Sequence, residues 1–456
     1  DNLRRQRQMC IRDRVAAACG DDDDASSETS DSETTTTTVA SDTDDEMADT
    51  GDTGDTEDTA DTEDTAAAPA GDPEATNGFD GETITLGYLV DESGPLAILG
   101  GPLAVGSQVY WDAINEEQGG VAGKYQVELA VGDTKDDQGT AVTEYQRLKD
   151  DAVLFAEILS TPPTQAVLEF LKEDNVVGVP GSLAGMWALE ANLLPNGASN
   201  ENEMINLADW FVNESGLGGV DSVHCSVSMD DIYGEAGMTG VDHAADGLGY
   251  ELAVEQTIAR GDTDFSSTVA ALSGAGCEVV HAVTVPTEQN ALMAEASSNG
   301  FEPVWLGALP SYLNLFAAGN PERFTNFYIA LDSPDLNDTD VPGMAKFIER
   351  FATYGEGEPG SFQLSGYFQQ ISVHALLEKA VELGDLSREG IAEAMKQLGE
   401  VDTEGLTAEN YVYGAPEDRI PTTGTRIFQF DPDNPPNLLT EVANIDSELN
   451  ETLVVG

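Results

Sequence analysis

Basic residues, cysteine, histidine and long apolar runs are all scarce in this chain of 456 residues. Lysine and arginine together number 19 against 85 aspartates and glutamates, so the formal net charge is −66. A field of this sign repels phosphate backbones and anionic lipid headgroups, which excludes nucleic acid as a partner. No window approaches the run of about 18 apolar residues that a membrane-spanning helix needs. We therefore expect the folded part of the chain to be soluble.

The few cysteines and histidines also argue against metal or cofactor chemistry. The chain has four histidines without a cluster, and its four cysteines are Cys10, Cys19, Cys225 and Cys277. Four cysteines are too few for a disulfide scaffold, and they lack the C-x-x-C spacing of a zinc site. The acidic stretches at 133–137 and 230–231 lack calcium-loop spacing. We expect no metal, no cofactor and no catalytic carboxylate pair.

Acidic residues are concentrated near the start of the chain. Residues 15–80 hold 22 aspartates and glutamates and no lysine or arginine. Few apolar residues and high like charge cannot offset the entropy of ordering, so residues 20–81 are expected to be a disordered tether. The rest, residues 81–456, carries 61 acidic and 14 basic residues. This acidity fits a salt-rich environment and fits simple solubility equally well.

The segment before the tether resembles the end of a bacterial lipobox. Small residues, Ala16 to Ala18, precede Cys19, and a polar tether follows. Such a motif normally follows an apolar stretch of 7–15 residues, whereas residues 1–14 hold five arginines and almost nothing apolar. We expect residues 1–19 to be an incomplete signal region that ends in a lipidated Cys19, with residues 1–14 a truncation or sequencing scar. The alternative is a chance match in a low-complexity region.

From Glu82 onward, short β-branched runs alternate with longer amphipathic runs. The first series predicts strands over 84–90, 125–131, 153–159 and 176–179, with helices over 99–118, 140–150 and 164–173. The second series predicts strands over 221–228, 252–258, 278–283 and 304–307, with helices over 234–247, 264–274 and 288–299. Helices over 344–354, 366–383 and 387–398 and a hairpin of 425–430 with 438–442 follow.

Strands separated by helices imply an α/β fold with parallel sheets that are covered on both faces. Because the series occurs twice, we expect two lobes rather than one long sheet. In such sheets the ligand crevice lies at the carboxyl ends of the strands, where helix N-termini offer free N–H groups. Two such rims that face each other make a cleft that closes on its ligand by hinge motion.

Four segments resemble, in order, the branched-chain amino-acid binding family, the type I extracytoplasmic solute receptors of ABC importers. The first is ITLGYLVDESGPLA at 84–97, and the second is AINEEQGGVAG at 113–123. The third is DDIYGEAG at 230–237, and the fourth is GDTDFS at 261–266. The resemblance covers residues 82 to about 445. It implies the type I periplasmic-binding-protein fold, with two doubly wound parallel-sheet lobes joined by three chain crossings.

The resemblance also implies a domain division and a function. Lobe one should comprise residues 82–203 and 333–418, and lobe two residues 204–332 and 419–456. The chain should be a monomeric, non-enzymatic lipoprotein at the outer face of the bacterial cytoplasmic membrane, or periplasmic. It should capture a small amino-acid-like or carboxylate-bearing solute and deliver it to an ABC permease. The alternative is a ligand sensor of the same fold that regulates a partner protein.

The candidate ligand-binding residues lie on the loops at the two rims. They are Ser93, Ser160, Thr161, Gly181, Ser182, Trp187, Tyr233, Pro286, Ala308 and Tyr312. By resemblance, the Ser160 loop supplies hydroxyl and N–H donors to a ligand carboxylate, and Gly181 and Ser182 bind the carboxylate and amine. The alternative for Ser160 and Thr161 is a helix N-cap, which favours the same residue types.

The aromatic candidates also have packing alternatives. Tyr233 either closes the cleft from lobe two or packs between the lobes. Trp187 and Tyr312 either sandwich an apolar or aromatic ligand or simply pack under loops. Two departures weaken a plain leucine-type assignment: 285–288 lacks the family's aromatic, and 307–311 lacks its amine-pairing carboxylate. Glu288 is a substitute for that carboxylate or an exposed residue that interacts with the helix dipole.

Cys225 and Cys277 lie at or near strands that should be neighbours in lobe two. Export favours oxidation of such a pair. Because Cys277 starts its strand and Cys225 lies within the other, their Cα separation is compatible with values on either side of the roughly 7 Å limit for a bridge. The sequence leaves a disulfide between them open.

Overall fold

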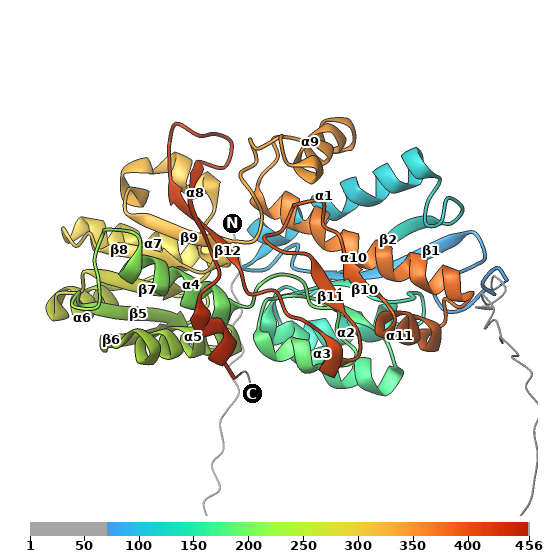
Figure 1. Cartoon of the computed structure of the whole chain (residues 1–456), viewed down its shortest axis with the longest axis horizontal. Helices are drawn as coiled ribbons and strands as arrows, with labels where there is room; N and C mark the ends of the chain where they lie inside the picture. Colours follow the sequence, from blue (N-terminus) through green and yellow to red (C-terminus); the bar gives the residue numbers. More distant parts are fainter. Residues whose placement is uncertain (1–70, 455–456) are drawn as a thin grey trace, which may run out of the picture. The chain divides into compact units, whose positions relative to one another are not determined.

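Two β-sheets organise the part of the chain that the computed structural model describes, residues 71–454 (Figure 1). The first sheet has the order β2-β1-β3-β4 and is entirely parallel. Its strands are β1 (Thr83–Val90), β2 (Gln126–Asp133), β3 (Phe155–Leu159) and β4 (Gly178–Gly181).

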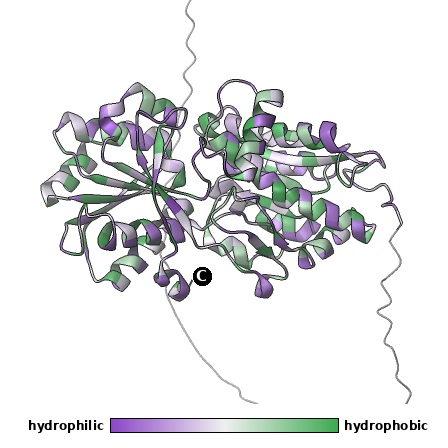
Figure 2. Ribbon diagram, turned by 45° about the horizontal axis from the view of Figure 1, so that its top comes forward, coloured by the Kyte–Doolittle hydropathy of each residue, from purple (hydrophilic) through white to green (hydrophobic). Residues whose placement is uncertain are grey.

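The second sheet is larger, with the order β13-β12-β9-β8-β7-β5-β6. Its parallel strands are β5 (His224–Met229), β6 (Leu252–Ile258), β7 (Val279–Val283), β8 (Val304–Gly307) and β9 (Phe327–Leu331). The antiparallel pair β12 (Thr425–Phe430) and β13 (Leu439–Ile445) extends its edge beside β9. Figure 2 shows these strands coloured mainly as hydrophobic, whereas the helices around them carry many hydrophilic residues.

Six helices accompany the first sheet. They are α1 (Ala97–Ala113), α2 (Gln138–Leu148), α3 (Thr161–Asp174), α9 (Pro342–Tyr354), α10 (Ser361–Leu383) and α11 (Arg388–Lys396). Helix α10 packs along α1 although some 260 residues separate them (Figure 1). Gly106 and Gly366 permit this approach, since a Cβ on either would lie within 2.1 Å of a backbone oxygen of the facing helix. The contact places the start of α10 beside the first sheet's loops.

Five helices accompany the second sheet. They are α4 (Asn200–Asn213), α5 (Ile232–Leu248), α6 (Ser266–Ala275), α7 (Pro286–Ser298) and the short α8 (Asn314–Gly319). Asp231 caps α5, because its Oδ1 accepts from the N–H groups of Tyr233 and Gly234 at 3.0 and 3.1 Å. A separate two-stranded ribbon pairs β10 (Gly399–Val401) with β11 (Tyr411–Tyr413).

The α/β class and the parallel sheets are confirmed, and the strands predicted at 252–258 and 304–307 have the predicted bounds. Several elements were not predicted, namely α4, α8, β9 and the ribbon strands β10 and β11. Helix α4 carries apolar residues at helical spacing, Met204, Leu207 and Phe211, which were overlooked among its buried polar residues. Helix α10 begins five residues before the predicted start, and the helix predicted over 99–118 changes at Ile114 to a π-helix, Ile114–Gln118.

The folded body begins earlier than predicted. Phe79 pairs with Thr76 and Ile84 and is 2% exposed, with its ring 5.1 Å from that of Tyr125. The end of the predicted tether therefore belongs to the fold, because an aromatic side chain anchors it. The lobe boundary predicted at 203/204 falls inside α4, and the division into lobes stays a prediction. The region at 1–19, with Cys19, and most of the tether lie outside the described residues.

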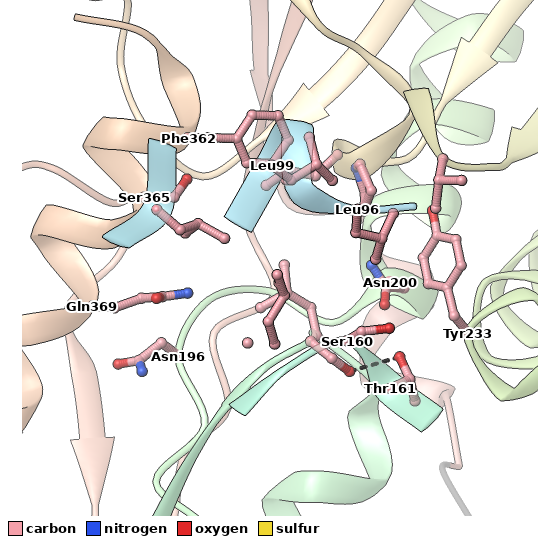
Figure 3. Close-up of a pocket in the computed structure, with 18 of the residues that line it drawn as sticks. Leu96, Leu99, Ser160, Thr161, Asn196, Asn200, Tyr233, Phe362, Ser365 and Gln369 are labelled. Atoms are coloured by element: carbon pink, nitrogen blue, oxygen red, sulfur yellow. Dashed lines mark hydrogen bonds between the residues drawn. The ribbon is translucent and has the colours of Figure 1, made fainter. Parts of the chain in front are cut away.

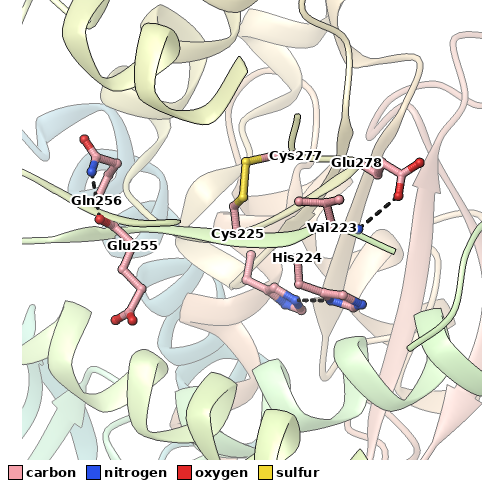
Figure 4. Close-up of a disulfide and its surroundings, with 8 residues drawn as sticks. Val223, His224, Cys225, Glu255, Gln256, Cys277 and Glu278 are labelled. Carbon is pink, nitrogen blue, oxygen red and sulfur yellow. Dashed lines mark hydrogen bonds between the residues drawn. A yellow bond between two sulfur atoms is a disulfide. The ribbon is translucent and has the colours of Figure 1, made fainter. Parts of the chain in front are cut away.

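A disulfide joins Cys225 on β5 to Cys277 just before β7 (Figure 4). Their Cα atoms are 5.9 Å apart, which lies within the range for a bridge. Of the two alternatives that the sequence left open, the structure has the bridged one. Between residues 71 and 454, no helix is long and apolar enough to cross a membrane, and no group of three or more metal-ligating side chains occurs.

Candidate functional site

A cavity lies where the carboxyl ends of strands from both sheets approach each other (Figure 3). Its empty volume is about 770 Å³, including space open to solvent. Loops after β3, β4, β6, β7, β8 and β9 contribute to its lining, together with α1 and α10. Both sheets therefore supply residues to one site, as the loop analysis predicted.

Hydroxyl groups gather at one part of this cavity. Thr161 Oγ1 and Ser182 Oγ are hydrogen-bonded at 2.8 Å (Figure 3). Ser182 Oγ also accepts from Trp187 Nε1 at 3.0 Å. If Ser182 donates its proton to Thr161, the Thr161 hydroxyl retains a proton that it can offer to a ligand acceptor. We call Ser160, Thr161 and Ser182 the hydroxyl cluster.

Ser160 has an unusual backbone conformation, with φ 80° and ψ 146°. A non-glycine residue at positive φ is strained, and such strain is concentrated at functional sites. Its hydroxyl is buried and makes no hydrogen bond within the described residues, and it does not cap α3. The N-cap alternative therefore does not account for this side chain. Because prolines occupy the first turn of α3, this loop offers hydroxyls and few free N–H groups.

The cavity wall contributed by the second sheet's loops contains one aromatic residue and one cation. Tyr233 lines the cavity and donates its hydroxyl to Thr284 O at 3.1 Å, so it is both a lining and a packing residue. Arg260 Nε donates to Asp231 Oδ2 at 2.8 Å, and its Nη1 lies 3.1 Å from Asp136 Oδ2. Burial raises the pKa of Asp136 to about 6, although Arg260 opposes that rise. Since two carboxylates already face Arg260, it is not a free anion anchor.

The rest of the lining is mainly apolar. It consists of Leu96, Leu99, Leu103, Leu159, Leu183, Val285, Leu309, Pro310, Phe362 and Phe368. Leu99 and Leu103 are four residues apart on α1, so they share one helix face. The one carboxylate among the lining residues is Asp332, whose Oδ1 accepts from Ala198 N at 3.3 Å. Burial raises the pKa of Asp332 to about 7.

Five of the ten predicted ligand residues line this cavity: Ser160, Thr161, Gly181, Ser182 and Tyr233. Trp187 and Tyr312 do not line it and do not form the predicted sandwich. Trp187 is fully buried, and Tyr312 donates to Asn437 O at 2.7 Å while its ring packs on Phe327. Both side chains therefore pack within the fold, which is the alternative that the sequence left open for them.

The other three predicted residues also lie outside the lining. Ser93 is exposed and donates its hydroxyl to Asp133 Oδ2 at 2.6 Å. Pro286 is the first residue of α7, and Ala308 is fully buried beside the lining residue Leu309. The alternative that made Glu288 an exposed residue is wrong. Its side chain is only 3% exposed, and its Oε1 accepts a hydrogen bond from Gly261 N at 2.7 Å.

Sequence reasoning missed the lining residues from α1 and α10. Phe362, Ser365 and Gln369 come from a helix whose first turn was not predicted. Their helical spacing, read without the structure, is that of any buried helix face. No local motif distinguishes them from core residues.

The chain and its fold are similar to known proteins. The chain is similar to Leu/Ile/Val-binding protein homolog 7 of Brucella abortus (strain 2308), with 24% identity over 349 residues, covering 72% of this chain and 84% of that protein. Its fold is similar to a fatty acid ABC transporter substrate-binding protein from Thermomonospora curvata, with 26% identity and a TM-score of 0.76, covering 84% and 97%. A branched-chain amino acid ABC transporter protein from Thermus thermophilus with bound valine gives 17% identity and a TM-score of 0.71, covering 81% and 98%.

A family model described as periplasmic binding protein matches residues 83–435, which is most of the chain. Members of this family bind small solutes outside the cytoplasm and work with ABC transporter permeases, and they are not enzymes. The resemblance noted in the four sequence segments is confirmed. This chain belongs to the periplasmic binding protein family and is a substrate-binding protein of the ABC transporter type.

Proposed function

We propose that this protein binds a solute with one carboxylate and an aliphatic portion, and delivers it to an ABC permease. The observation that carries the proposal is the division of the cavity into a hydroxyl cluster and a mainly apolar remainder. Hydroxyls donate to a carboxylate without adding a charge, and a few placed polar groups in an apolar pocket are typical of small-molecule sites. The carboxylate is assigned to Ser160, Thr161 and Ser182, and the aliphatic portion to the leucine and phenylalanine side chains.

A free α-amino acid fits this lining less well. An α-ammonium group beside the carboxylate needs a carboxylate partner or several acceptors. Val285, Leu309 and Pro310 contribute no charged group to the lining, which leaves the Asn200 amide oxygen and the Asp332 carboxyl as acceptors. One neutral oxygen and a carboxyl whose pKa burial raises to about 7 match an ammonium group poorly. The Thermomonospora curvata relative is described as a fatty acid binder. An acid without an α-amino group is therefore the proposed solute.

We also propose that Cys19 carries the lipid that holds the protein at the outer face of the cytoplasmic membrane. Two acyl chains on an N-terminal cysteine give stable membrane binding, which one chain does not. The acidic segment after Cys19 would then separate the body from the anionic membrane surface by charge repulsion.

A thermal-shift screen tests the proposed solute class. The probes are straight-chain monocarboxylic acids of six to twelve carbons, leucine, isoleucine, valine, benzoic acids, amides and dicarboxylates. A ligand that binds only the native state raises the midpoint of unfolding as its affinity and concentration increase. The monocarboxylic acids should give the largest shifts. Larger shifts with the branched-chain amino acids would show that the solute class is wrong.

A further inference from the structure

The side-chain amide oxygen of Gln369 is buried and has no hydrogen-bond partner within residues 71–454. The residue is 7% exposed. Gln369 lines the cavity, and Figure 3 shows its amide pointing into it. Buried side-chain amides are nearly always hydrogen-bonded, so an exception needs an explanation. A ligand group in the cavity supplies one.

Two neighbours make this part of the cavity polar. Ser365 lies one turn before Gln369 on α10, so both side chains share a helix face that lines the cavity. Asn196 also lines it, but its amide oxygen already accepts from Tyr413 Oη at 2.9 Å. The groups left for a ligand are therefore the Gln369 amide and the Ser365 hydroxyl.

This polar end lies across the cavity from the hydroxyl cluster. Figure 3 shows Gln369, Ser365 and Asn196 on one side, Ser160 and Thr161 on the other, and apolar side chains between them. A solute that places its carboxylate on the hydroxyl cluster therefore points its far end at Gln369. A purely aliphatic end would bury the amide without a hydrogen bond, which is costly.

We propose that Gln369 is a specificity-determining residue that hydrogen-bonds a terminal hydroxyl group of the solute, which makes the substrate class ω-hydroxy carboxylic acids. The proposal rests on the proposed function, because it uses the same cavity and the same carboxylate position. A primary amide both donates and accepts, as a hydroxyl does, so the two groups are matched.

Charge favours a hydroxyl over an ionised terminal group. Arg260 is the one cation among the lining residues, and Asp231 and Asp136 already face it. A second carboxylate would therefore be buried without a counter-charge. A terminal ammonium would depend on Asp332, which is already an acceptor for the Ala198 N–H and whose pKa is raised to about 7 by burial. Solutes with a terminal ammonium group or a second carboxylate are therefore included in the experiment below.

Calorimetry with matched acids tests the assignment. The probes are 6-hydroxyhexanoate, 8-hydroxyoctanoate, 10-hydroxydecanoate and 12-hydroxydodecanoate, each compared with the unsubstituted acid of the same length. The ω-amino acid and the dicarboxylate of the best length complete the set. In the unaltered protein, the hydroxy acid of the best length should bind about tenfold or more tightly than its unsubstituted counterpart, because the site rejects an analogue that leaves its polar group unpaired.

Gln369→Met keeps the length of the side chain and removes its hydrogen-bonding groups. This variant should lose the tenfold preference by weakening hydroxy-acid binding, while its affinity for the unsubstituted acid stays equal or rises. Gln397→Met, at an exposed position after α11, is the control and should keep the preference. The ratio of two affinities measured in one variant does not depend on its stability, so a merely structural role of Gln369 would not change it.

The outcomes separate the two proposals. If both series bind and the preference is absent from the unaltered protein, or persists in Gln369→Met, the role of Gln369 is overturned and the proposed function stands. Tighter binding of the ω-amino acid or the dicarboxylate also overturns it. If no acid of either series binds, the proposed function fails and the assignment of Gln369 fails with it.

Discussion

Thr161→Val is the most informative change in the hydroxyl cluster, because it replaces a hydroxyl by a methyl group of similar size. Thr161 is 2% exposed, and its Oγ1 lies 2.8 Å from Ser182 Oγ. The change removes one donor to the ligand carboxylate and leaves the Ser182 hydroxyl without this partner. A hydrogen bond to a charged group contributes about 1.5–3 kcal/mol, so the dissociation constant should rise by about tenfold to a hundredfold.

Titration calorimetry with the best monocarboxylic acid measures this change. Thr143→Val is the matched control, since it removes an exposed hydroxyl on α2 that donates to Gly139 O at 2.9 Å and lies outside the cavity lining. The control should bind as the unaltered protein does. An unchanged dissociation constant in Thr161→Val, with the acid still bound, would show that the carboxylate does not lie on the hydroxyl cluster.

Three further predictions concern other parts of the chain. Replacing both Cys225 and Cys277 by alanine should lower the free energy of unfolding by about 4 kcal/mol, as expected for a crosslink between residues 52 apart. A loss below about 1 kcal/mol in a denaturant titration would contradict this prediction. Burial lowers the pKa of His281 from 6.5 to about 3. Below pH 6.5 the unfolded chain therefore binds a proton at His281 that the folded protein does not bind, so the free energy of unfolding falls as the pH drops. When the pH is lowered from 7 to 5, the free energy of unfolding should therefore fall by about 2 kcal/mol less in His281→Gln than in the unaltered protein, as measured by denaturant titration at each pH. An equal fall in both proteins would mean that His281 titrates normally. With a complete signal peptide supplied, the protein should fractionate with membranes and Cys19→Ser should not, while a membrane-bound Cys19→Ser would rule out the lipid anchor.

The sheets could be predicted from sequence because their strands are short β-branched runs between amphipathic helices. The carboxyl-end rule then located Ser160, Thr161 and Ser182, since it depends only on where strands β3 and β4 end. The same reasoning could not separate Trp187 and Tyr312 from ligand residues. An aromatic side chain on a loop is equally suited to packing, and the contacts that it makes in the folded structure decide between the two.

The apolar and far polar parts of the site could not be predicted. Gln369 and Phe362 reach the cavity because α10 packs on α1, a contact between segments about 260 residues apart that no local pattern encodes. Helix α4 was missed for a related reason. Its buried Asn200, Glu203 and Asn206 hydrogen-bond to one another or to distant segments, although Asn200 Oδ1 and Glu203 Oε1 have no partner within the described residues. Because these polar residues stand among the apolar residues of the helix, its apolar spacing was overlooked.

A crystal structure of the protein with its best monocarboxylic acid is the most direct test of the central claim. The account predicts one acid molecule in the cavity between the two sheets, with its carboxylate within hydrogen-bonding distance of the Thr161 and Ser182 hydroxyls and its aliphatic portion against Leu99 and Leu103. An acid bound with its carboxylate away from those hydroxyls, or bound outside this cavity, would contradict the account.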